Sequence, residues 1–123
     1  MFAVTVEGSF TAEHQLTMAD GEKEDLHSHG WIVKVSVSAE KLDNTGIAVD
    51  FIELKQIIDD VTCPFEGKIL EELNLFGSPG INASAENIAR YIFDGIEPKL
   101  SGDVKLESVK VREAKGCWAK YSK

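Results

Sequence analysis

The strongest constraint on the fold is a pair of segments in which apolar and polar residues alternate. In residues 31–39, valines occupy every second position, with lysine and serine residues between them. Residues 2–10 alternate in the same way, with phenylalanine or valine at positions 2, 4, 6 and 10. Successive side chains of a strand point to opposite faces, so each segment predicts a strand with one buried face. The polar stretch 17–25 predicts a loop between them, too long for a tight hairpin.

Two helices are predicted in the middle of the chain. Asp50 is a favourable N-cap, and apolar residues follow it at helical spacing until Cys63-Pro64. Ser84 is a second N-cap, followed by isoleucines at every fourth position as far as Pro98. Between the two helices, residues 68–75 predict a short helical piece, and the Gly-Ser-Pro-Gly sequence at 77–80 predicts a turn.

The C-terminal part predicts two further strands. Val104 and Leu106 share one parity while Val109 and Val111 share the other, so a bulge near residues 107–108 is needed to bury both pairs on one face. Residues 118–121 predict the last strand. The order strand, strand, helix, helix, strand, strand favours an α+β fold, a single domain over residues 1–123 whose antiparallel sheet carries the helices on one face.

Composition and charge narrow the range of partners and locations. Thirteen basic and twenty-one acidic residues give a formal net charge of −8, which argues against nucleic acid or an anionic membrane as partner. Cys63 and Cys117 have no metal-binding or redox spacing and are interpreted as reduced thiols. The first residues lack the pattern of a signal peptide, and apolar runs are too short to span a membrane, so we expect a cytoplasmic protein.

The three histidines of the chain lie within sixteen positions. His27 and His29 are two residues apart, so on a strand they point the same way, on the side of the valines that follow. His14 lies just past the end of the first predicted strand, so pairing of the two strands lets three imidazoles converge. Three such nitrogens form a catalytic type of zinc site with one open position. The alternative is scattered surface histidines, because the spacing of His27 and His29 also arises by chance.

Five ordered motifs resemble those of one known family. Residues 10–14 (FTAEH) resemble its F-x-A-x-H, and residues 26–29 (LHSH) resemble L-H-G-H. Residues 46–51 (GIAVDF) are similar to G-M-V-V-D-F, residues 84–89 (SAENIA) to T-x-E-N-L-A, and residues 111–113 (VRE) to V-x-E. The order and approximate spacing hold over nearly the whole chain. The sequence therefore resembles the family of 6-pyruvoyl-tetrahydropterin and 6-carboxy-tetrahydropterin synthases.

The resemblance implies the tunnelling fold, with a four-stranded antiparallel sheet and two helices on its outer face. It also implies trimers that close a barrel and stack into a homohexamer, with 7,8-dihydroneopterin triphosphate as the substrate. By the same resemblance, a zinc ion (Zn2+) is held by His14, His27 and His29. Glu113 would anchor the pterin ring, because a carboxylate can accept two adjacent N–H groups at once. Ser84 and Glu86 would lie near that ring.

Two positions depart from the family pattern. Cysteine-dependent members carry a base four residues before the first histidine of H-x-H, where this chain has Lys23. A second group carries glutamate three residues before that histidine, and Glu24 stands there. The aspartate and histidine of the family's L-D-H motif appear here as Glu66 and Gly67, so the Asp-His proton relay is missing.

These departures leave three functional hypotheses. The first is a zinc lyase that resembles an aldolase and cleaves dihydroneopterin or its phosphates to 6-hydroxymethyl-7,8-dihydropterin, with Glu24 as base and Glu66 as the other candidate. A single-proton aldol cleavage suits one carboxylate base. The second is 6-pyruvoyl- or 6-carboxy-tetrahydropterin synthase activity, which needs protons moved on both faces of the ring. The third is a non-catalytic, zinc-containing pterin-binding module.

Overall fold

The structure is a computed structural model of the chain that describes residues 1–76 and 81–123. Four strands form one antiparallel sheet in the order β1-β2-β3-β4. Their bounds are β1 Phe2–His14, β2 His27–Ala39, β3 Val104–Ala114 and β4 Cys117–Tyr121. The predicted α+β class and the chain order are confirmed.

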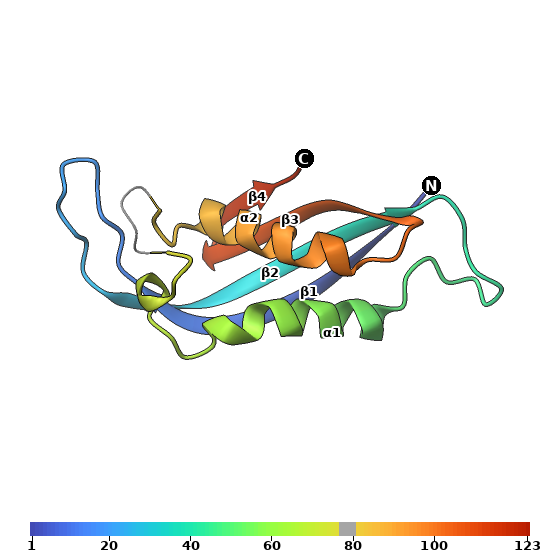
Figure 1. The fold of residues 1–123 in the computed structure, drawn as a ribbon, viewed down its shortest axis with the longest axis horizontal. Coiled ribbons are helices and arrows are strands. Elements are labelled where there is room, and N and C mark those ends of the chain that lie inside the picture. Colours follow the sequence, from blue (N-terminus) through green and yellow to red (C-terminus); the bar gives the residue numbers. More distant parts are fainter. Residues whose placement is uncertain (77–80) are drawn as a thin grey trace.

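Two helices, α1 (Phe51–Thr62) and α2 (Ala85–Ile96), lie on the same face of the sheet (Figure 1). The side chain of Asp50 caps α1, and Oγ of Ser84 caps α2 by accepting a hydrogen bond from the N–H of Asn87 at 3.2 Å. Short 3₁₀ turns follow at Cys63–Phe65, Leu70–Glu72 and Glu97–Lys99. Both predicted helices therefore begin and end close to the expected residues.

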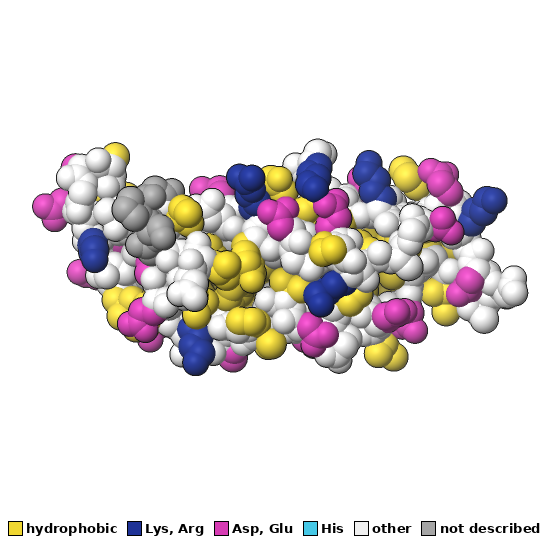
Figure 2. Space-filling model, viewed as in Figure 1, with side chains coloured by type: hydrophobic (Ala, Val, Ile, Leu, Met, Phe, Trp, Pro, Cys, Tyr) yellow, Lys and Arg dark blue, Asp and Glu magenta, His cyan; other side chains and the backbone are white. Residues whose placement is uncertain are grey.

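The core lies between the helices and one face of the sheet. The predicted alternation is confirmed, because the valines at 33, 35 and 37 are fully buried while Ile32 and Lys34, at alternate positions, are more exposed. Trp31 is also fully buried and stacks on Phe10 with ring centroids 5.9 Å apart. Figure 2 shows the helix-covered side of the molecule, where charged side chains are scattered among hydrophobic ones and no histidine is visible.

The first two strands are longer than predicted, and this places the histidines inside the sheet. The strand ladder extends to His14 paired with His27, so His14 is the last residue of β1 rather than a residue beyond it. The alternation continues through Ala12, which is buried, and the indole N–H of Trp31 donates to the Ala12 carbonyl at 3.2 Å. Sequence patterning missed this extension because alanine and histidine are weak strand signals.

The helical piece expected at residues 68–75 is wrong except for one 3₁₀ turn at Leu70–Glu72. The N–H of Gly67 instead donates to the Thr11 carbonyl, and the N–H of Glu13 donates to the Lys68 carbonyl. The segment satisfies backbone groups on the outer edge of β1, which competes with helix formation. The turn expected at residues 77–80 lies outside the described residues.

The bulge expected near residues 107–108 is confirmed. Ser36 pairs with Ser108, whereas the next residue of β2, Val37, pairs with Leu106. Glu107 is therefore the extra residue, and it allows both halves of β3 to bury their apolar side chains on the helix side. Among the described residues, the structure contains no helix of the length and hydrophobicity that a membrane crossing requires.

Candidate metal centre

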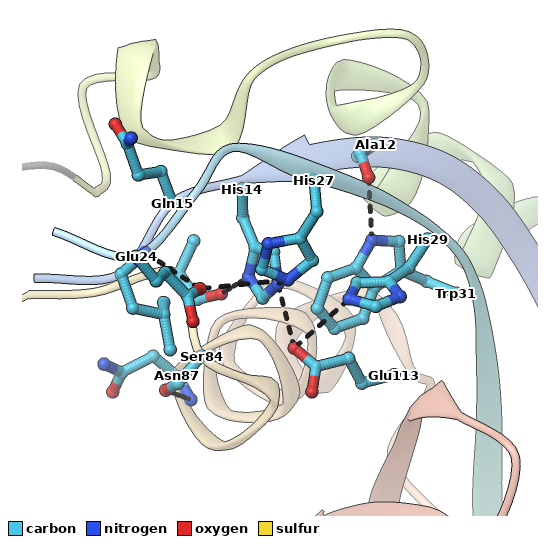
Figure 3. A network of polar contacts seen from close by, with 12 residues as sticks. Ala12, His14, Gln15, Glu24, His27, His29, Trp31, Ser84, Asn87 and Glu113 are labelled. Atoms are coloured by element: carbon cyan, nitrogen blue, oxygen red, sulfur yellow. Dashed lines mark hydrogen bonds and ion pairs between the residues drawn. The ribbon is translucent and has the colours of Figure 1, made fainter.

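Three histidines converge at one end of the sheet, on the face that the helices cover. The register between β1 and β2 sets His14 opposite His27 and Ala12 opposite His29, so the three rings share one face. Glu113 joins them from β3, and one ligand atom from each of the four side chains lies within 4.8 Å of the others. Figure 3 shows the four side chains pointing toward one another. The convergence expected from strand parity is therefore present.

Backbone carbonyls orient two of the rings. Nδ1 of His14 lies 2.8 Å from the carbonyl oxygen of Ala83, and Nδ1 of His27 lies 2.7 Å from that of Asp25. A carbonyl oxygen only accepts hydrogen bonds, so both Nδ1 atoms carry a hydrogen and both Nε2 atoms present a lone pair when the rings are neutral. Those two Nε2 atoms are 2.8 Å apart. Two lone pairs at that distance repel unless a proton or a metal cation lies between them.

His29 completes the arrangement in a form suited to a metal. Its Nε2 atom is one of two buried side-chain polar atoms without a hydrogen-bond partner among the described residues. Burial, opposed by the carboxylate of Glu113, holds the pKa of His29 below its usual value of 6.5. The ring is therefore neutral at pH 7, which is the form that binds metal ions.

Glu113 is the acidic member of the cluster. Its Oε1 atom lies 2.9 Å from Nε2 of His14 and 3.8 Å from Nε2 of His29. The predicted parity with Val109 and Val111 explains why it points to the buried face. Three imidazole nitrogens and one carboxylate oxygen are a donor set that zinc accepts. The orphaned nitrogen of His29 and the facing lone pairs of His14 and His27 fit a cation at this point.

The other predicted site residues lie at different distances from the cluster. Oε1 of Glu24 is 3.8 Å from Nε2 of His27 and accepts a hydrogen bond from the N–H of Leu16 at 3.1 Å. Ser84 follows Ala83, whose carbonyl binds His14, so the start of α2 is brought close to the histidines (Figure 3). Glu86 lies in the first turn of that helix and is exposed.

Glu66 is placed elsewhere. Its Oε2 atom accepts a hydrogen bond from the N–H of Thr11 at 2.7 Å, on the outer edge of β1. It lines a cleft of about 550 Å³ together with Cys63 and residues of both β1 and β2. Within the described part of a single chain, Glu66 has no hydrogen bond or ion pair with a histidine.

Several supporting groups were not found from the sequence. The carbonyls of Ala83 and Asp25 are backbone groups, so no residue type marks them. Glu71 binds two backbone N–H groups beside the cluster, of Gln15 and Ala83, and stands in the sequence as one of two adjacent glutamates. The sequence therefore does not distinguish Glu71 from the glutamate beside it, and its role follows only from the folded segment that replaces the expected helical piece.

Comparison with known proteins places these features in context. A family profile described as 6-pyruvoyl tetrahydropterin synthase matches residues 3–123. Dihydroneopterin monophosphate aldolase of Pyrococcus furiosus is 32% identical over 105 residues, which cover 85% of this chain and 83% of that protein. The 6-carboxy-5,6,7,8-tetrahydropterin synthase of Synechocystis is 32% identical over 126 residues, which cover 98% and 93%.

Solved structures share the fold at lower identity. The 6-pyruvoyl tetrahydropterin synthase of Caenorhabditis elegans superposes with a TM-score of 0.84 at 22% identity, covering 100% of this chain and 97% of that one. A Plasmodium vivax 6-pyruvoyltetrahydropterin synthase superposes with a TM-score of 0.79 at 19% identity, covering 99% and 97%. That protein is a variant in which a glutamate, described as a catalytic residue, is replaced by alanine.

The donor set leads to a prediction about metal content. The purified protein should contain about one zinc ion per chain, and His27→Ala and His29→Ala should each lose most of it, because a three-histidine site reduced to two binds zinc weakly. Elemental analysis after dialysis measures this. Cys63→Ser is the matched control, since Cys63 is an exposed thiol outside the cluster. Full zinc occupancy in both histidine variants would contradict the assignment.

Proposed function

This chain belongs to the 6-pyruvoyl tetrahydropterin synthase family, and we propose that it is a zinc-dependent lyase that cleaves the side chain of 7,8-dihydroneopterin or its phosphates. The product would be 6-hydroxymethyl-7,8-dihydropterin. The observation that carries the proposal is the carboxylate of Glu24, 3.8 Å from Nε2 of His27, beside a site without the family's cysteine and Asp-His pair. The similarity to an archaeal dihydroneopterin monophosphate aldolase supports the same reaction class.

Zinc would be held by His14, His27 and His29, with Glu113 in reach as a further oxygen donor. When bound there, zinc would supply a Lewis acid that lowers the pKa of a substrate hydroxyl and stabilises negative charge on its oxygen. The carbonyls of Ala83 and Asp25 would fix the rings in the tautomer that leaves Nε2 free.

Glu24 would act as the general base of a retro-aldol cleavage. Its carboxylate takes the proton from the hydroxyl on the second side-chain carbon, and that carbon becomes the carbonyl of the leaving aldehyde. The bond between the first and second side-chain carbons breaks, and its electron pair passes into the conjugated ring. The first carbon then takes up a proton, and Glu24, now protonated, is suited to return it. One carboxylate thus serves both proton transfers.

The hydrogen bond from Leu16 supports this role for Glu24. It fixes one carboxylate oxygen at 3.1 Å, and the N–H of Glu24 in turn donates to the Leu16 carbonyl at 3.0 Å. These contacts hold the side chain toward the histidines although the loop around it is exposed. A carboxylate is also named as catalytic in the Plasmodium vivax protein that shares this fold.

The second candidate function is synthesis of a tetrahydropterin. It is favoured by the similarity to 6-carboxy-5,6,7,8-tetrahydropterin synthases over nearly the whole chain. That chemistry moves protons on both faces of the ring, and Gly67 stands where the family carries its relay histidine. A zinc-containing binding module without turnover is the third reading. Of the two reactions, the aldol cleavage needs fewer proton-transferring groups, and Glu24 alone is suited to supply them.

Glu113 would anchor the pterin, with Ser84 and Glu86 near the ring. The amino-pyrimidinone edge and the side chain lie at opposite ends of the bicyclic ring. The carboxylate would therefore turn away from His14 when substrate binds, and its side chain, 31% exposed, has room to do so. Both adjacent N–H donors of the ring would then meet one charged acceptor.

The protein would work as a homohexamer of two stacked trimers. β1 and β4 are the edge strands of the sheet, and unpaired edges favour association with further strands. Residues 66–69 cover the edge of β1 only near Thr11 and Glu13. Beside the other end of β1 lies a groove of about 410 Å³ whose lining includes the exposed side chains of Phe2 and Phe51. An apolar groove beside an open edge suits a second copy of the chain.

The base is tested by Glu24→Gln. The variant keeps an oxygen that accepts the hydrogen bond from Leu16 but cannot take the proton, so turnover should fall about 10²–10⁴-fold while zinc content stays near normal. Mass spectrometry of products from dihydroneopterin and its phosphates measures turnover and separates the hydroxymethyl product from a 6-carboxy product.

Glu22→Gln and Glu66→Gln are the controls and should lose far less activity. Parent-like turnover by Glu24→Gln would remove it as the base. If the parent itself converts none of these pterins while binding them, the binding module is the correct reading.

The pterin anchor is tested by Glu113→Gln. Loss of the charged acceptor should weaken pterin binding by roughly 1.5–3 kcal/mol, about ten- to a hundredfold, as measured by calorimetry. Glu86→Gln, on the exposed first turn of α2, should change affinity less. Unchanged affinity in Glu113→Gln would exclude this residue from the pterin site.

The assembly is tested by light scattering at micromolar concentration. The parent should have the mass of six chains, and Phe51→Glu should give smaller species, because it places a charge in the apolar groove without disturbing the core of one chain. Met18→Glu, at an exposed apolar position in the loop at the other end, is the control. A monomeric parent would contradict the hexamer.

A further inference from the structure

Among the described residues Glu71 has no hydrogen bond or ion pair with a histidine, yet its carboxylate is bound to the two segments that orient His14. Its Oε1 atom accepts a hydrogen bond from the backbone N–H of Gln15 at 2.8 Å, and its Oε2 atom accepts one from the N–H of Ala83 at 3.1 Å. Gln15 directly follows His14, and Ala83 supplies the carbonyl that binds Nδ1 of His14 at 2.8 Å. One carboxylate therefore joins both sides of the contact that sets the His14 tautomer.

The chemistry of these contacts requires a carboxylate. Both backbone groups are donors, and an ionised carboxylate offers two acceptor oxygens and no hydrogen. An amide at the same position offers one oxygen and one NH₂, so one of the two N–H groups would face another donor. The contacts with Gln15 and Ala83 are partly buried, where water compensates poorly for a lost charged acceptor.

The same segment also anchors the loop that carries Glu24. Gln15, held by Glu71, precedes Leu16, whose N–H and carbonyl both bind Glu24. One residue further, the side-chain amide of Asn82 accepts from the N–H of Thr17 and donates to its carbonyl, both at 2.9 Å. The chain leaving β1 is thus attached to the segment before α2 at Gln15, through Glu71, and at Thr17, through Asn82.

We propose that Glu71 is a positioning residue of the metal centre. It holds His14 and the Ala83 carbonyl in register, so that Nδ1–H is committed to the carbonyl and Nε2 faces the other histidines. Through Leu16 it also holds the root of the loop that presents Glu24. This inference rests on the proposed zinc function. Partners of this kind change metal affinity by typically 10–100-fold when they are replaced.

The test compares Glu71→Gln with Glu72→Gln, its exposed neighbour. Zinc dissociation constants come from competition with a chromophoric chelator, on protein shown to be folded by circular dichroism. Glu71→Gln should bind zinc about 10–100-fold more weakly than the parent, and Glu72→Gln within about twofold. The absorption spectrum of the protein saturated with Co²⁺ should also change in Glu71→Gln alone, because it reports the orientation of the ligands.

A purely structural role would lower the melting temperature of Glu71→Gln and leave its zinc affinity and Co²⁺ spectrum unchanged, which would overturn the inference. If Glu71→Gln does not fold, Glu71→Asp takes its place. It keeps the charge but is too short to reach both N–H groups, and it should show the same changes to a smaller degree. If the parent binds zinc and these variants bind it equally well, only the role of Glu71 is refuted. A parent that binds no zinc refutes the proposed function as well.

Discussion

The antiparallel register between β1 and β2 is the constraint on which the site depends. It sets His14 opposite His27 and places His29 one pair further along the same face. A shift of one residue would turn the histidines of one strand to the other face of the sheet. The valines of β2 prevent that shift, because the same register buries them under α1 and α2. The packing that stabilises the sheet therefore also assembles the candidate metal ligands.

Register brings the rings together, and backbone carbonyls decide which nitrogens face one another. The carbonyls of Ala83 and Asp25 take the Nδ1 hydrogens and leave two Nε2 lone pairs 2.8 Å apart. Nearby carboxylates from β3 and from the loop add negative charge around that point. In a chain of formal net charge −8, the facing lone pairs and these carboxylates together favour a cation at this one place.

The loop between β1 and β2 shows how an exposed segment can carry a functional group. Its polar composition predicted only a loop, and the family resemblance alone singled out Glu24. In the structure Glu24 is bound to Leu16 in both directions and points to His27. The anchoring comes from residues far away in the sequence, among them Asn82, which binds Thr17. A loop that is tied at its root can hold a carboxylate in place without being buried.

Local patterns in the sequence determined the elements of this protein. Three features depend only on near neighbours: the alternation of the strands, the caps at Asp50 and Ser84, and the parity change before Val109. The strands, helices and bulge were therefore predictable. The convergence of the histidines was also implied by parity and by the family resemblance. The sequence did not predict where β1 and β2 end. It also did not predict that the segment expected to be helical covers the edge of β1 instead. Both features are decided by partners that are distant in the sequence.

Only the tertiary structure decided how the three histidines are oriented and which acids reach them. Glu24, Glu66, Glu71 and Glu113 are the same residue type in sequence. Folding placed Glu113 and Glu24 beside the histidines, Glu66 on the outer edge of β1 and Glu71 on two backbone N–H groups. The physical reason is that a carboxylate takes its role from the donors around it, and those donors are brought together only by contacts between distant parts of the chain.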